Sequence, residues 1–349
     1  MANSALDWTD VLATSGIGTY AGGLFFVSGR DHGFSVAVSR DGYYWTNCHV
    51  QPYFIDQVTR VRRGFLGRGV PYPAAPYQEV LYQSSDGCQW QPSSLPYLTY
   101  SGLQLAVFGN GILLGTIYSG SKQTTDIYVS EDMTNWAVTT NALAGAYGYG
   151  VTFGHGKFMA IHTEYQAGQS YGVLHRSGGG RDWSEKVTFG PLPAGAGPWG
   201  VIYANRTYLA FGYDRHVYSS VDGSHWTQHD TGFPYTMSDF ELAGFWSGRY
   251  FLVPLTGANR MDLLLSDATA SAIDRARMLP DLCRRLPDGA MLLTVEAPYG
   301  REVTVEASSD LATWSAIATD PCDTGEFEVY DEGAKAVGHR FYRAWQAGP

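Results

Sequence analysis

The segment Ser39-Arg40-Asp41-Gly42-Tyr43-Tyr44-Trp45 decides the fold, because its seven-residue pattern S-x-D-G-x-x-W recurs along the chain. Residues 84–90 and 220–226 repeat this heptad in full, residues 130–136 lack the glycine, and residues 177–183 lack the acid. The third positions of the copies are 41, 86, 132, 179 and 222, so neighbouring copies lie 43 to 47 residues apart. A steady period of this length predicts a repeated structural unit.

The heptad has a local physical explanation. Ser and Asp side chains accept hydrogen bonds from backbone N–H groups and close a tight turn, and glycine supplies a positive-φ corner. The tryptophan then begins the next strand and buries its ring between neighbouring sheets. The heptad therefore predicts a hairpin between two outer strands, and we expect its acids and tryptophans to be structural. A decayed copy surrounds Ser266-Asp267.

A second repeated unit precedes each heptad. It consists of an apolar strand, a glycine-containing turn and another apolar strand, as in residues 105–114 and 150–160. Together with the heptad hairpin, this unit predicts four antiparallel strands per period of about 45 residues. Such a period is typical of one blade of a β-propeller.

The heptads resemble the Asp boxes of the sialidase superfamily, and the resemblance covers about residues 8–275. It implies a propeller without specifying an activity, since sialidases, other glycosidases, lyases, receptors and assembly factors share the motif. A hydrolytic sialidase needs an arginine triad, a Tyr–Glu nucleophile pair and an Asp acid. The early Arg-Ile-Pro motif of that family is absent, and Ser28-Gly29-Arg30 holds the nearest arginine. Sialidase activity is therefore disfavoured.

We predict an all-β chain with two domains. Residues 1–280 form a six-bladed propeller, in which an N-terminal strand around Trp8 completes the last blade and removes exposed strand edges. Residues 287–349 resemble the small C-terminal β-sandwich modules of secreted planctomycete and verrucomicrobial proteins. The alternative is a seventh blade, because residues 308–314 keep the heptad spacing.

The net charge and the distribution of apolar residues argue against some classes of binding partner. The net charge of -10 argues against nucleic acid as the main partner, and no run of 18 apolar residues predicts membrane insertion. No signal peptide is visible after Met1, although the resemblance implies an extracellular or periplasmic bacterial protein. Cys283 and Cys322 are expected either to form a disulfide or to remain as buried thiols. No C-x-x-C pair is present, and we expect neither a metal nor a cofactor.

Function is expected on the propeller face opposite the heptad turns, where loops from the inner strands converge in a funnel. Aromatic rings and arginines there would bind a ligand, and acid/base groups would permit catalysis. The candidate ligand-binding residues are Tyr53, Tyr97, Tyr100, Tyr147, Tyr149, Trp199, Tyr235, Arg60, Arg215 and Arg260. The candidate catalytic residues are His162, Glu164, Tyr165, Arg30, His32 and Asp239.

Three functions are compatible with these residues. The first is a propeller that binds a glycan or similar small ligand in its aromatic funnel. The second is a carbohydrate-active enzyme, either a glycoside hydrolase or a polysaccharide lyase, that uses His, Tyr, Glu and Arg in the same funnel. The third is a scaffold for protein interactions with a filled funnel.

Overall fold

The computed structural model describes most of the chain. The described residues are 18–28, 36–41, 44–48, 53–62, 64–71, 80–93, 104–119, 121–132, 135–144, 150–193, 195–212, 216–231, 240–246, 249–256, 260–261, 264–265 and 273–346. The secondary structure of these residues is almost entirely β, as predicted. None of their helices is long and apolar enough to span a membrane.

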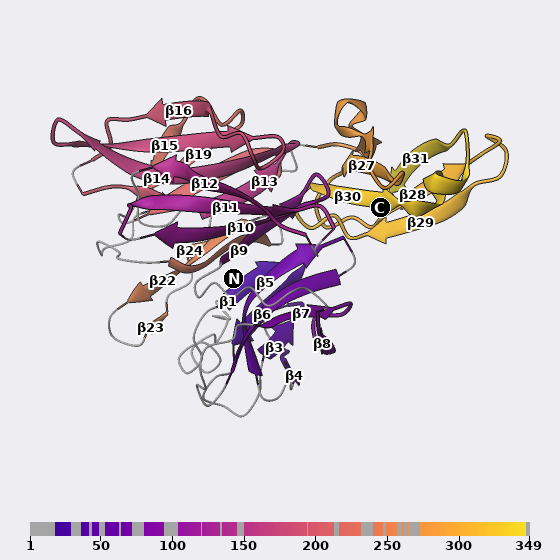
Figure 1. Ribbon diagram of the computed structural model, residues 1–349, viewed down its shortest axis with the longest axis horizontal. Helices are drawn as coiled ribbons and strands as arrows, with labels where there is room; N and C mark the ends of the chain where they lie inside the picture. The colour runs from indigo at the N-terminus through magenta and orange to yellow at the C-terminus, as the bar shows by residue number, and fades with distance from the viewer. Residues whose placement is uncertain are drawn as a thin grey trace, which may run out of the picture.

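Six antiparallel sheets follow one another along the chain and form blades 1 to 6 (Figure 1). Blade 1 contains β1 (Gly18–Ala21), β2 (Leu24–Ser28), β3 (Val36–Ser39) and β4 (Thr46–Cys48). Blade 2 contains β5 (Tyr53–Val61), β6 (Gly64–Pro71), β7 (Val80–Ser84) and β8 (Trp90–Pro92). Blade 3 contains β9 (Gln104–Gly109), β10 (Ile112–Ser119), β11 (Thr124–Ser130) and β12 (Ala137–Ala144). Blade 4 contains β13 (Gly150–Gly154), β14 (Lys157–Gln166), β15 (Gln169–Ser177) and β16 (Glu185–Phe189). Blade 5 contains β17 (Pro198–Ala204), β18 (Thr207–Gly212), β19 (His216–Ser220) and β20 (Thr227–Asp230). Blade 6 contains β21 (Phe240–Trp246), β22 (Arg249–Thr256), β23 (Arg260–Met261) and β24 (Leu264–Leu265).

The first strands of the blades contact one another in cyclic order. β1 meets β5, and the series continues through β9, β13, β17 and β21 until β21 meets β1. The ring is therefore a closed six-bladed propeller, as predicted. In blade 6, the short strands β23 and β24 pair with the same edge of β22 in the same antiparallel register, so together they take the place of one third strand. The predicted closing strand around Trp8 lies outside the described residues.

The heptads form the turns that their chemistry predicts. In blade 2, Ser84 Oγ accepts the Gly87 N–H at 2.9 Å, and Asp86 Oδ1 accepts the Gln89 N–H at 2.7 Å. The indole N–H of Trp90 donates to Gly87 O at 2.8 Å. The same bonds recur in blade 5 through residues 220–226. The acids and tryptophans of these turns are thus structural, as predicted.

The C-terminal domain is a β-sandwich. One sheet contains β25 (Arg277–Met278), β26 (Arg284–Arg285), β27 (Met291–Glu296) and β30 (Glu326–Asp331), and the other contains β28 (Val303–Ser308), β29 (Ser315–Asp320) and β31 (Phe341–Gln346), with short 3-10 helices at Pro280–Leu282 and Glu332–Ala336. Because β25 and β26 pair with β27, this sheet includes residues before the predicted boundary at 287. The heptad of residues 308–314 joins β28 to β29, so the seven-bladed alternative is wrong.

The sandwich contacts each blade at the turn between its first two strands or at the strand residues beside that turn. In blades 1 to 3 the contacts are Asp323 with Gly23, Asp320 with Arg60 and Glu328 with Asn110. In blades 4 to 6 they are Glu326 with His155, Thr324 with Asn205, Glu296 with Arg206 and Tyr299 with Phe245. Several of these turns are built for close approach, since Asn110 and Gly111 both have positive φ, at 53° and 73°. The sandwich therefore covers this end of the propeller axis, leaving a cavity of about 250 Å³ beneath it.

The disulfide differs from the one considered from the sequence. Cys48 in β4 is bonded to Cys88 in the heptad turn of blade 2, and Cys283 and Cys322 are free thiols. The Sγ of Cys283 faces Leu279 O, while the Sγ of Cys322 faces Ala297 O, so the two thiols have separate partners. The predicted alternative of free thiols is confirmed, and the observed bond ties blade 1 to blade 2.

Candidate functional site

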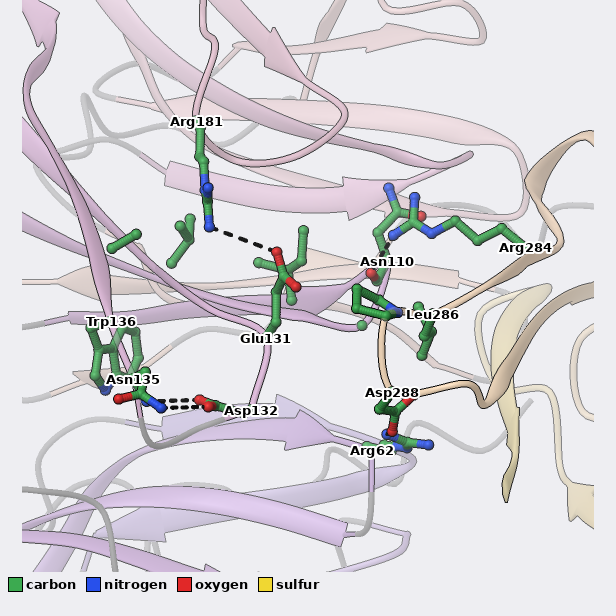
Figure 2. Close-up of a pocket in the computed structure, with 15 residues that line it drawn as sticks. Arg62, Asn110, Glu131, Asp132, Asn135, Trp136, Arg181, Arg284, Leu286 and Asp288 are labelled. Atoms are coloured by element: carbon green, nitrogen blue, oxygen red, sulfur yellow. Dashed lines mark hydrogen bonds and ion pairs between the residues drawn. The ribbon is translucent and has the colours of Figure 1, made fainter. Parts of the chain in front are cut away.

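A cleft of about 830 Å³ opens between blade 3 and the sandwich (Figure 2). One wall contains residues 131–132 and 135–137 of blade 3, and the opposite wall is the β26–β27 hairpin of the sandwich. Arg62 from blade 2 and Arg181 from the heptad of blade 4 complete it. This interdomain cleft lies on the heptad side of the propeller, whereas the sequence favoured the opposite face.

The propeller wall of the cleft carries two carboxylates, those of Glu131 and Asp132. Asp132 accepts both the backbone N–H and the side-chain amide of Asn135, each at 2.7 Å. The neighbouring Glu131 points into the cleft toward Arg181, as Figure 2 shows, with 3.7 Å between its Oε1 and the guanidinium. Both side chains are more than half exposed, so their ion pair is weak and its groups remain accessible to a ligand.

The sandwich wall is anchored by polar contacts to the propeller. Arg284 donates to Asn110 O, which joins the hairpin to blade 3. Asp288 accepts from Lys335 at 2.9 Å and pairs with Arg62 at 3.3 Å. The hydrogen bond from Lys335 is the main reason that the pKa of Asp288 falls to about 2, so this group is a carboxylate at neutral pH.

The charges of the interdomain cleft balance. Three guanidinium groups, of Arg62, Arg181 and Arg284, face three carboxylates, of Glu131, Asp132 and Asp288. Apolar surface from Ile112, Val129, Leu286 and Pro287 lies among them. A wall with both donors and acceptors suits hydroxyl groups, each of which donates one hydrogen bond and accepts others. The arrangement can therefore hold a neutral polyhydroxylated molecule better than a polyanion.

The predicted catalytic residues His162 and Glu164 lie together in β14, away from this cleft. His162 Nε2 is 3.3 Å from Glu164 Oε1, and the His162 ring stacks on His175 with centroids 5.4 Å apart. Lys186 Nζ donates to Glu164 Oε1 at 2.7 Å. This polar cluster sits on the side of blade 4 that packs against blade 3, since the alternate residues Phe158 and Ala160 join that core.

Burial determines the protonation of this cluster. The pKa of His162 falls to about 4, mainly because of burial and also because of the charge of His175, while Glu164 acts in the opposite direction. Burial acts to raise the pKa of Glu164, but the hydrogen bond from Lys186 helps to hold it below its usual value. At neutral pH the cluster therefore contains a neutral His162 imidazole beside a Glu164–Lys186 ion pair.

The other predicted residues are not brought to this cluster. Tyr165 is 73% exposed and, as the next residue after Glu164 in a strand, faces the other side of the sheet. Trp199 in β17 packs edge-on against Phe211, with ring centroids 5.7 Å apart. Arg60 pairs with Asp320 of the sandwich at 2.5 Å, at the capped end of the axis.

Most of the predicted funnel cannot be placed. Tyr53 lies in β5 and Arg260 in β23, and the structure does not describe their side chains. The predicted residues outside the described ranges are Arg30, His32, Tyr97, Tyr100, Tyr147, Tyr149, Arg215, Tyr235 and Asp239. Among the described residues, no group of three or more His, Cys, Asp or Glu side chains is placed to hold a metal ion.

The cleft residues Glu131, Arg181 and Arg284 did not appear among the predicted sites. Glu131 and Arg181 belong to heptads, whose conspicuous residues are structural, and Arg284 belongs to the sandwich, whose contact with blade 3 no sequence pattern indicates. The available signal was the irregularity of these two heptads, because residues 130–136 lack the glycine and residues 177–183 lack the acid. Irregular copies of a structural repeat mark positions where neighbouring parts of the fold differ.

No family model and no curated protein matches the sequence. The chain is similar to PorZ, a surface component of the type-IX secretion system of Porphyromonas gingivalis, with 12% identity and a TM-score of 0.43 over 95% of this chain and 51% of that chain. It therefore spans about half of PorZ. It is also similar to a fungal alcohol oxidase of the AA5 family, with 10% identity and a TM-score of 0.47 over 94% of this chain and 78% of that one. A putative gluconolactonase aligns with 10% identity and a TM-score of 0.43 over 70% and 85% of the two chains. These values identify neither a family nor an activity.

Proposed function

We propose that this protein is an extracytoplasmic Asp-box β-propeller that binds a neutral oligosaccharide in its interdomain cleft. The observation that carries the proposal is the cleft itself, a cavity of about 830 Å³ in which three guanidinium groups and three carboxylates balance around apolar surface. Sugars present hydroxyl groups on their edges and apolar C–H faces, and this wall matches both. The predicted aromatic funnel on the opposite face stays a prediction.

The location outside the cytoplasm has independent support. The Cys48–Cys88 bond joins two blades, and structural disulfides persist mainly in oxidising compartments. The net charge of -10 also suits a balanced cleft, because an acidic glycan approaching this protein would meet overall repulsion.

The test is a glycan array with neutral and acidic oligosaccharides, followed by calorimetric titration of the hits. The Arg181→Ala/Glu131→Ala double variant should bind a hit at least about fivefold more weakly, because two or more hydrogen bonds of roughly 0.5–1.5 kcal/mol each are lost. Its melting temperature should stay unchanged, since both side chains are exposed.

Lys157→Ala serves as the matched control. Lys157 forms an exposed ion pair with Glu185 in blade 4, outside the cleft lining, so its loss should leave glycan affinity unchanged. Equal affinity of the double variant and the wild type would contradict the proposed site. An array with no hit among neutral glycans would contradict the function.

A second candidate, a carbohydrate-active enzyme, is favoured by one observation, the 3.3 Å contact between His162 and Glu164. A neutral imidazole beside a carboxylate can act as a general base. Assays for new reducing ends and for unsaturated uronates test it. Activity that is lost in His162→Ala would support an enzyme, and no product from any polysaccharide would eliminate it.

A further inference from the structure

The sheet of β28, β29 and β31 lies on the side of the sandwich farthest from the propeller (Figure 1). Strand β31 carries a row of exposed side chains. Along β31, Phe341, Arg343 and Trp345 point outward, while the alternate residues Tyr342 and Ala344 pack against the sandwich core. Phe341 is 40% exposed and Trp345 is 47% exposed. Two large rings thus stand on one face of one strand, and we call these three residues the aromatic row.

The polar residues of this face neutralise one another. Arg343 lies opposite Glu306 of β28 and donates to its Oε2 at 2.6 Å. The same guanidinium lies over the Trp314 ring, 4.3 Å from its centroid. Arg343 is therefore held between a carboxylate and a ring. The Arg343–Glu306 pair therefore adds no net charge beside the two rings.

The geometry of the strand sets the separation of the two rings. Phe341 and Trp345 are four residues apart, so their attachment points are about 13 Å apart at the usual strand rise. A ligand that contacts both rings must extend farther than one monosaccharide. Both side chains point outward and are partly exposed, so one extended molecule can reach both.

The area of the row disfavours a second copy of the chain as its occupant. With side-chain areas of about 150–250 Å², the exposed fractions of Phe341 and Trp345 amount to roughly 200 Å² together. A stable protein interface buries about 800 Å² on each partner. The absence of net charge on the row disfavours acidic polymers, which guanidinium groups would hold. Stacking on a neutral sugar chain requires neither a large area nor a charge.

We propose that the aromatic row binds a neutral polysaccharide chain by stacking its sugar rings on Phe341 and Trp345. This surface is separate from the interdomain cleft, so the protein has one site for an oligosaccharide and another that attaches it to a polymer. The second site needs no movement of the sandwich against the propeller.

Co-sedimentation of the full chain with insoluble cellulose, curdlan or starch granules tests this proposal, with pectate gel as an acidic polymer. We expect wild type to sediment with at least one neutral polymer. The Phe341→Ala/Trp345→Ala variant should bind at least about tenfold more weakly, and Phe341→Tyr/Trp345→Tyr should restore binding because it restores the stacking surface. Tyr44→Ala is the control, since Tyr44 is 84% exposed but lies in blade 1.

The outcomes separate the two proposed sites. The cleft variant Arg181→Ala/Glu131→Ala should still sediment with the polymer, and the row variant should still bind array glycans in solution. Sedimentation only with pectate, or equal binding by wild type and the row variant, would overturn the aromatic-row proposal. A wild-type dimer that the row variant converts to a monomer would assign the face to a second copy and would overturn it as well.

Discussion

The heptad turn of blade 5 and the heptad turn of the sandwich have the same hydrogen bonds in different surroundings. In blade 5, Ser220 Oγ accepts the Gly223 N–H at 2.8 Å, and in the sandwich Ser308 Oγ accepts the Leu311 N–H at 2.9 Å. The aspartates at the third position accept two backbone N–H groups in both turns. The heptad therefore specifies a turn, and it does so whether the turn belongs to a propeller or to a sandwich.

The fourth residue of the heptad shows how packing against a neighbouring blade constrains the turn. Gly223 has a φ of 67°, and a Cβ there would lie 2.3 Å from Met159 Cε of blade 4. Leu311 holds the same position in the sandwich with a φ of 62°, and its side chain is 59% exposed. Glycine is thus favoured at position 223 of blade 5 by both backbone conformation and packing, whereas Leu311 in the sandwich turn points largely to solvent.

The largest expected difference concerns the tryptophans. Trp183 in blade 4 is 5% exposed and packs against Leu114 and Phe158, so Trp183→Ala should lower the free energy of unfolding by about 3–5 kcal/mol. Trp314 of the sandwich is less buried, and Trp314→Ala should cost about 1 kcal/mol through its lost contact with Arg343. Urea unfolding of both variants measures the difference. Equal losses would mean that the two turns have equivalent surroundings.

An exchange at the fourth position should have a smaller effect of opposite sign in the two turns. Gly223→Leu should destabilise by about 2–3 kcal/mol, because it adds a strained left-handed residue and a clash with Met159. Leu311→Gly should raise the free energy of unfolding by about 0.5–1 kcal/mol. The substitution removes the strain of a left-handed leucine, and this gain exceeds the cost of the larger conformational entropy that glycine gives the unfolded chain. Thermal melts of the two variants compare them. A destabilised Leu311→Gly would contradict this reason for the difference.

The smallest effect concerns pH. Hydrogen bonds from the Thr313 and Ala312 N–H groups hold the pKa of Asp310 at about 2, and comparable bonds to His225 lower the pKa of Asp222. A carboxyl whose pKa falls on folding stabilises the folded state above its unfolded pKa of about 4, and this stabilisation disappears as the pH falls toward 2. Carboxyl chemical shifts recorded from pH 1 to 6 should show both groups ionised above pH 4. A midpoint of Asp310 near 4 would mean that its turn is open in solution.

The sequence allowed the local structure to be predicted but not the long-range contacts. Residues 39–45 and their copies contain every group that closes a heptad turn, so turns, blades and even the sandwich hairpin follow from the pattern. The Cys48–Cys88 bond depends on which strand lies beside which turn, and the period does not encode that. The cleft likewise requires the sandwich to sit on blade 3, where Arg284 meets Asn110 O. His162 and Glu164 lie together because residues two apart on one strand share a face of the sheet, whereas their catalytic role stays a prediction.

The most direct test of carbohydrate binding in the interdomain cleft is amide hydrogen exchange of the protein with and without a neutral oligosaccharide from the array. Exchange is slowed where a ligand holds the backbone and its neighbours in place. We predict protection at residues 131–132 and 135–137 of blade 3 and at residues 284–288 of the sandwich, which belong to the two walls of the cleft. Protection confined to the opposite face of the propeller, with both walls unchanged, would contradict the proposed site.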